Sequence, residues 1–168
     1  WIPEDLELLR SVDPDGRGLL DDEFLRKSAV EGTPENGAVE HILKGIEIDL
    51  PEGIYFLDKE GFRRTRSRMA WWLEPRPHLT VGEVVFPPGT TESSYPLREE
   101  DKSLLSGYIG EKPLFLGHYW LSGSPRPLTP RIACLDYSVA TGGKLVAYTF
   151  RGERELRAEH FASVPMRT

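Results

Sequence analysis

Residues 113–120 read Pro-Leu-Phe-Leu-Gly-His-Tyr-Trp, an apolar segment followed by a glycine, a histidine and two aromatic residues. The apolar part predicts a short buried strand. Further strands are predicted at 131–136, at 144–150, where side chains alternate, and at about 156–164. A side chain at the carboxyl end of a strand faces a crevice rather than the core. His118 is therefore the histidine of greatest functional interest, although a lone histidine is more often structural than a ligand.

Upstream of this stretch, the chain changes from helical to extended character. Proline and acidic residues mark helix starts, and glycine marks a helix end. The predicted elements are helices at 3–10, 20–30 and 35–44, hairpin strands at 54–58 and 62–66 with the second running on through 68–72, a long loop over 74–100 with one strand at 82–86, and a weak helix at 99–108. Helices followed by mostly antiparallel strands predict an α+β fold.

The length of 168 residues fits a single unit. Within it we expect a mainly helical part at 1–45, a hairpin and long loop at 46–112, and strands at 113–168. The composition of 39% hydrophobic residues is too rich for disorder. Lys and Arg number 21 against 27 Asp and Glu, and this net charge of −6 argues against nucleic acid as a partner.

The single cysteine, Cys134, excludes an internal disulfide framework and a multi-cysteine zinc site. It also favours a reducing compartment, so we expect a cytoplasmic location. No apolar run approaches the ~20 residues that a membrane span needs, and the acidic start of the sequence is unlike a signal peptide. We therefore expect no membrane partner.

Other patterns support weaker hypotheses. The segment 13–18 has the outline of a calcium loop, but Arg17 and Phe24 stand where ligands are required, so a capped turn is the better interpretation. The strand Arg63–Trp72 carries several arginines, whose guanidinium groups match phosphate oxygens. The better interpretation of the same strand is a solvated face closed by core tryptophans. Ser138 has no triad partners at a recognisable spacing, and no phosphate-binding glycine loop occurs.

Residues 113–120, together with Ala-Cys-Leu-Asp-Tyr-Ser at 133–138 and Gly-Gly-Lys-Leu-Val-Ala-Tyr at 142–148, resemble the end of a calcineurin-like metallophosphoesterase. The arrangement is similar to that of the serine/threonine phosphatase and diadenosine tetraphosphatase branch. The segments 43–47, 50–53, 57–59 and 68–72 resemble a bacterial subgroup of that family. The resemblance covers roughly residues 38–164.

The resemblance implies a four-layer α/β/β/α sandwich with two divalent metal ions, which are Mn, Fe, Zn or Co. It makes His118 a metal ligand. Arg66 and Arg68, which share one face of the arginine-rich strand, are the candidate phosphate contacts. It places these residues in the pocket around the ligand: Gly117, Tyr119, Asp136, Tyr137, Gly142 and Gly143. The other ligand motifs of the family are absent, and Trp1 stands where one of them can end, so the resemblance implies the C-terminal half of the enzyme.

The expected function is hydrolysis of phosphate esters or anhydrides by a metal-bridging hydroxide. The substrate is a phosphoprotein, a small phosphomonoester or a dinucleoside polyphosphate. No catalytic residue is assigned with certainty in this half, and we expect the chain alone to be inactive. Its expected partner is the missing N-terminal half, a second chain or another copy in a homodimer. The alternative hypothesis is a stand-alone, non-catalytic ligand-binding module that uses the strand Arg63–Trp72.

Overall fold

The computed structural model describes residues 2–58, 61–91 and 93–167. Helices come first along the chain and small, mainly antiparallel sheets follow, with 26% of residues in helices and 21% in strands. The predicted α+β character is therefore confirmed at this level. Among the described residues, no helix has both the length and the apolar composition needed to cross a bilayer.

The second and third of the N-terminal helices begin where side chains cap them. Asp21 accepts a hydrogen bond from the Phe24 amide at 2.7 Å, and Thr33 accepts one from the Asn36 amide at 3.1 Å. Because Asp21 is the cap, the second helix starts later than predicted. The last of these helices ends before Gly45, which takes a positive φ of 84°. The helices are α1 (Pro3–Val12), α2 (Asp22–Ser28) and α3 (Pro34–Lys44).

The sheets are small, and most of them join neighbouring parts of the chain. The antiparallel pairs are β1 (Glu47–Asp49) with β4 (Arg66–Arg68), β2 (Phe56–Leu57) with β3 (Arg63–Arg64), and the sheet β7 (Asp136–Tyr137), β8 (Lys144–Tyr148) and β9 (Phe161–Pro165). The parallel pair is β5 (Leu114–Leu116) with β6 (Ile132–Cys134). The short helices are α4 (Val81–Val84), α5 (Glu99–Lys102), η1 (Val139–Thr141) and η2 (Ala158–His160).

Several sequence predictions in the middle of the chain are wrong. The strand expected at 82–86 is largely the helix α4, because Thr80 and Glu83 form a capping box. The second hairpin strand does not run on to 72, since β4 pairs separately with β1 and ends at Arg68. The strand β5 was predicted to be buried, but Leu114 and Leu116 are only partly buried and Phe115 is 36% exposed. Part of the predicted hairpin turn, at 59–60, lies outside the described residues.

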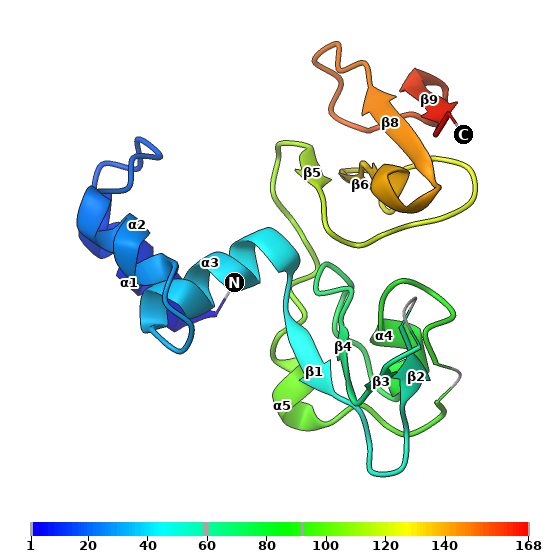
Figure 1. Ribbon diagram of the computed structural model, residues 1–168, viewed down its shortest axis with the longest axis horizontal. Helices are drawn as coiled ribbons and strands as arrows, with labels where there is room; N and C mark the ends of the chain where they lie inside the picture. Colours follow the sequence, from blue (N-terminus) through cyan, green and yellow to red (C-terminus); the bar gives the residue numbers. More distant parts are fainter. Residues whose placement is uncertain (1, 59–60, 92, 168) are drawn as a thin grey trace.

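A first hydrophobic cluster lies under β1 and β4 and includes Ile48, Met69 and Val84. A second lies under β5–β8 and includes Trp72 and Ile132. The side chains of Trp71 and Leu73 pack against both clusters and join them. The buried hydrophobic residues of α1–α3, Phe24 and Ala38, belong to neither cluster. In Figure 1 these helices form a group beside the sheets, so the helical part has only a small core of its own.

Candidate functional site

The site is built around His118, which follows β5 directly after Gly117. His118 has a φ of 66° and Trp120 has a φ of 50°, so both side chains are held on left-handed backbone. Left-handed backbone is rare for a bulky residue and is found mainly where the surroundings enforce it. The two rings lie 5.4 Å apart between centroids. The chain beyond β5 therefore presents an imidazole and an indole side by side.

Basic residues from two other segments act on His118. Burial lowers the pKa of His118, and the positive charges of Arg68 and then Lys44 lower it further. Asp136 and Glu40 oppose this effect, but to a smaller extent. The end of α3 and the end of β4 thus lie close enough to the turn after β5 for their charges to affect the imidazole. The lowered pKa favours the neutral ring, whose nitrogen lone pair can accept a metal ion or a proton.

Arg68 is the least satisfied cation of the site. Its side chain is 15% exposed, and its buried Nε has no hydrogen-bond partner among the described residues. Its Nη2 lies 4.0 Å from Glu47, at the limit of an ion pair, and its guanidinium lies 5.3 Å from the centroid of the Trp120 ring. A buried donor without a partner is costly, so an anion placed here would satisfy it.

Arg66 differs from Arg68 although both were expected to contact phosphate. The Nε of Arg66 lies 3.2 Å from Asp49, and its side chain is 59% exposed. Among charged groups, Arg68 has the largest effect on the pKa of His118. The structure therefore brings Arg68 to His118 and leaves Arg66 paired with the carboxylate opposite it in β1.

Tyr119 lies beneath this cluster and is 2% exposed. Its ring packs edge-on against Trp72 and Phe86. Burial raises the pKa of Tyr119 to about 12, although Trp71 and Arg68 act in the opposite direction. No described group meets its hydroxyl in hydrogen-bond geometry. Because a Cβ at Gly45 would lie closer than 3.0 Å to that hydroxyl, Tyr119 requires glycine at the end of α3.

The remaining predicted pocket residues lie in two places. Asp136 and Tyr137 form β7 and Gly142 and Gly143 lie in the turn before β8, whereas Gly117 directly follows β5. Asp136 accepts a hydrogen bond from the Ser138 amide at 3.0 Å, which fixes the position of its carboxylate. The charge of this carboxylate acts on the pKa of His118. Tyr137 is buried, and its carbonyl oxygen would lie within 3.0 Å of a Cβ at Gly143. Gly142 has a φ of 88°. Gly117 is exposed, and nothing lies within 4 Å of where its Cβ would be. These residues shape the turns that carry Asp136 and His118.

The donor set does not by itself fit a dinuclear metal centre. In the described part of the chain, no group of three or more His, Cys, Asp or Glu side chains is placed to hold a metal ion. Two ions a few ångströms apart need several carboxylates and imidazoles around them. Among the described residues, His118 has no such set of donors around it.

Sequence reasoning missed Lys44 and Trp120. Trp120 follows the glycine–histidine pair by two residues, so its proximity to His118 had a local signal in the sequence. Lys44 is 74 positions away from His118 and had none, because only the tertiary fold brings the end of α3 to β5. Comparison with known proteins found no matching family model, curated protein or solved structure.

Proposed function

We propose that the chain is one part of a dinuclear-metal phosphoesterase that hydrolyses phosphate esters or anhydrides. The observation that carries this proposal is the imidazole of His118, whose pKa is lowered by burial and by the charge of Arg68, together with the buried Nε of Arg68, which has no hydrogen-bond partner among the described residues. A phosphoryl group is the common biological anion that a guanidinium binds through paired N–H groups. An imidazole held neutral beside that anion position is suited to ligate a metal ion.

In this proposal the chain's own residues have separate roles. His118 supplies an imidazole ligand, and Arg68 donates hydrogen bonds to phosphoryl oxygens. Lys44 adds a positive charge, although it is also ion-paired with Glu40. Trp120 covers the guanidinium and limits its exposure to water. These roles concern binding and orientation, and the chain alone is expected to be inactive because one imidazole does not complete a metal centre.

A further feature supports a partner that completes the fold. Parallel sheets occur almost only where both faces are covered, yet β5 and β6 form a parallel pair with Phe115 at the surface. Exposed aromatic side chains at a sheet edge promote aggregation in a monomeric protein, or mark a site where another chain binds. We propose that another polypeptide segment, or a second chain, covers this region and adds the missing layers of a four-layer sandwich.

The alternative hypothesis of a binding module on the strand Arg63–Trp72 has less support. Arg64 is ion-paired with Asp58 at 2.7 Å, and Arg66 with Asp49. Trp72 is buried in the second hydrophobic cluster. The arginines and tryptophans therefore do not form one open ligand-binding face.

The test is hydrolysis of p-nitrophenyl phosphate with added Mn²⁺ by the protein at its natural length. His118→Asn, which tolerates left-handed backbone, is expected to lower kcat/KM by at least about 100-fold while the melting temperature stays near that of the wild type. The matched control is His78→Asn, because His78 is exposed and also has a positive φ of 62°. Equal activity of the two variants would contradict the role of His118.

A second measurement addresses Arg68 with the same substrate. Arg68→Gln keeps a polar side chain but removes the charge, so we expect KM to rise about tenfold or more. Arg76→Gln is the control, because Arg76 is an exposed arginine that pairs with Glu83 at 3.2 Å. A KM that is unchanged in the Arg68 variant would exclude the guanidinium as a phosphate contact.

A further inference from the structure

The group of helices α1–α3 carries the net charge of the whole chain. Residues 2–44 contain 11 Asp and Glu against 5 Lys and Arg, a difference of −6, which equals the net charge of all 168 residues. The rest of the chain is balanced. Such charge asymmetry between parts of a sequence is typical of a region that interacts with an oppositely charged partner.

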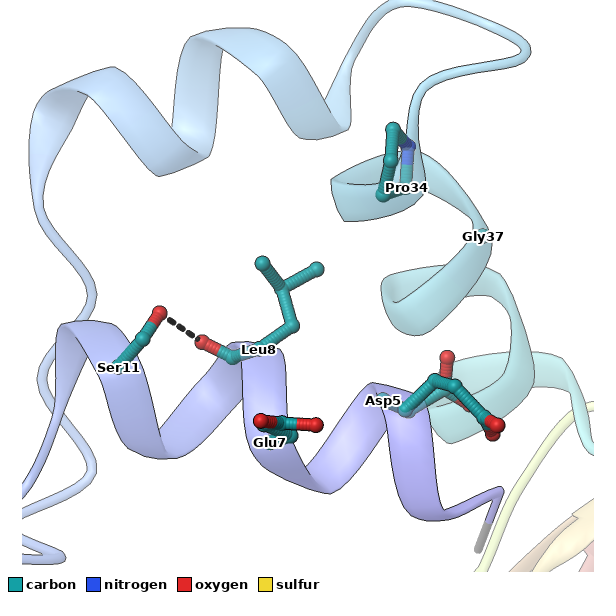
Figure 2. A pocket seen from close by; sticks show the side chains of 7 residues that line it. Asp5, Glu7, Leu8, Ser11, Pro34 and Gly37 are labelled. Carbon is teal, nitrogen blue, oxygen red and sulfur yellow. Dashed lines mark hydrogen bonds between the residues drawn. The ribbon is translucent and has the colours of Figure 1, made fainter.

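A groove of about 580 Å³ lies in this acidic group between α1 and α3. Figure 2 shows Leu8 of α1 pointing into it, with Pro34 and Gly37 of α3 on the opposite wall. Glu4 and Glu7 line its α1 side. The groove therefore combines an apolar floor with an acidic rim.

The two rim carboxylates are not neutralised within the described chain. Glu4 and Glu7 are exposed, lie one turn apart on α1, and make no ion pair with any described residue. Asp5, between them in sequence, differs because its Oδ2 lies 2.8 Å from Nδ1 of His41. Like charges one helical turn apart repel each other, and a cation from outside would relieve that repulsion.

Gly37 leaves space in the α3 wall of the groove. Glycine inside a helix is less favourable than alanine by roughly 1 kcal/mol. No described atom lies within 4 Å of the position that a Cβ on Gly37 would occupy. The glycine is thus not required by any contact within the described chain, and a larger side chain there would fill the groove.

We propose that this groove binds a cationic amphipathic helix of a partner protein. A large apolar side chain of that helix enters over Gly37 and contacts Leu8 and Pro34. Lysine or arginine side chains on either side of it meet Glu4 and Glu7. Helix-in-groove recognition of this kind uses an apolar anchor for affinity and charges for orientation. The proposal is independent of the phosphoesterase activity.

The test uses a fluorescent peptide of about 18 residues, long enough to form a helix, with leucines on one face and lysines on the other. We expect saturable one-to-one binding in fluorescence anisotropy that weakens as salt rises from about 0.05 M to about 0.5 M. Gly37→Leu is expected to weaken binding at least about tenfold because it fills the groove. Its leucine favours the helix, so circular dichroism should show an intact fold.

A pair of double variants separates the rim from general acidity. Glu4→Gln with Glu7→Gln is expected to weaken binding of the lysine peptide at least about tenfold. The matched control is Glu31→Gln with Glu155→Gln, which removes the same charge from exposed positions outside the groove. Equal loss in both double variants, equal binding of a leucine–glutamate peptide, or an absence of binding would overturn the proposal. A dimer of the chain itself that Gly37→Leu dissociates would also overturn it, in favour of a second copy.

Discussion

At the scale of single residues, glycines without space for a side chain shape the site. Gly45 lets the hydroxyl of Tyr119 approach the end of α3, and Gly143 lets the chain turn back over the carbonyl of Tyr137. Gly45 directly follows Lys44, and Gly143 lies in the turn after Asp136; the charges of Lys44 and Asp136 both act on His118. The geometry of the imidazole therefore depends on backbone positions that carry no functional group.

Gly143→Ala tests this dependence. Its Cβ would lie closer than 3.0 Å to the Tyr137 carbonyl oxygen, so the β7–β8 turn must open. We expect the free energy of unfolding in urea to fall by about 2–4 kcal/mol. Gly117→Ala is the control, because its Cβ meets nothing within 4 Å, and it should change the value by no more than about 0.5 kcal/mol. Equal stability of the two variants would contradict this dependence, because the β7–β8 turn would then accept a Cβ at position 143 without cost.

At the scale of elements, the hairpin of β8 and β9 is held by a carboxylate. Tyr148 donates a hydrogen bond to Glu153 at 2.5 Å, and the Arg151 amide donates one to the other carboxylate oxygen at 2.7 Å. Nδ1 of His160 lies 2.9 Å from the same carboxylate. The hydrogen bond from Tyr148 and those from the backbone lower the pKa of Glu153 to about 2. The ionised carboxylate thus joins β8 to the loop and to η2, which directly precedes β9.

This lowered pKa predicts a pH dependence of stability. The ordinary pKa of the group is 4.5, so between that pH and about 2 the unfolded chain binds the proton more readily than the folded chain. The contribution of Glu153 is therefore present above pH 4.5 and is lost as the pH falls toward 2. We expect the melting temperature of the wild type to fall more steeply over this window than that of Glu153→Gln. Parallel curves would contradict the assignment.

The helices and strands also show how much of the secondary structure can be predicted from the sequence. The N-terminal helices were predicted from proline, acidic residues and apolar spacing, and Gly45 marks the end of the third. The start of the second was predicted too early because Asp21 caps it. The helix α4 was not, because the run Gly82–Phe86 is rich in valine and looks extended. The capping box of Thr80 and Glu83 outweighs that propensity. The separation of β3 from β4 was missed because only the pairing partner β1 distinguishes them.

At the scale of the whole molecule, the candidate site consists of residues that are far apart in the sequence. His118 was singled out from its place after an apolar strand, and Arg68 from an arginine-rich run. Their meeting with Lys44 depends on the packing of the two hydrophobic clusters against Trp71 and Leu73. No local pattern encodes that packing. Sequence reasoning therefore identified candidate groups, and the fold selected which of them come together.

The most direct test of the proposed function is native mass spectrometry with elemental analysis, performed on the protein isolated at its natural length with any bound partner chain. We expect about two transition-metal ions per complete enzyme, because the phosphoesterase centre needs two. His118→Asn should reduce that number, and His78→Asn should leave it unchanged. A folded protein that contains no transition metal, or whose metal content is the same in both variants, would contradict the assignment of His118 as a ligand.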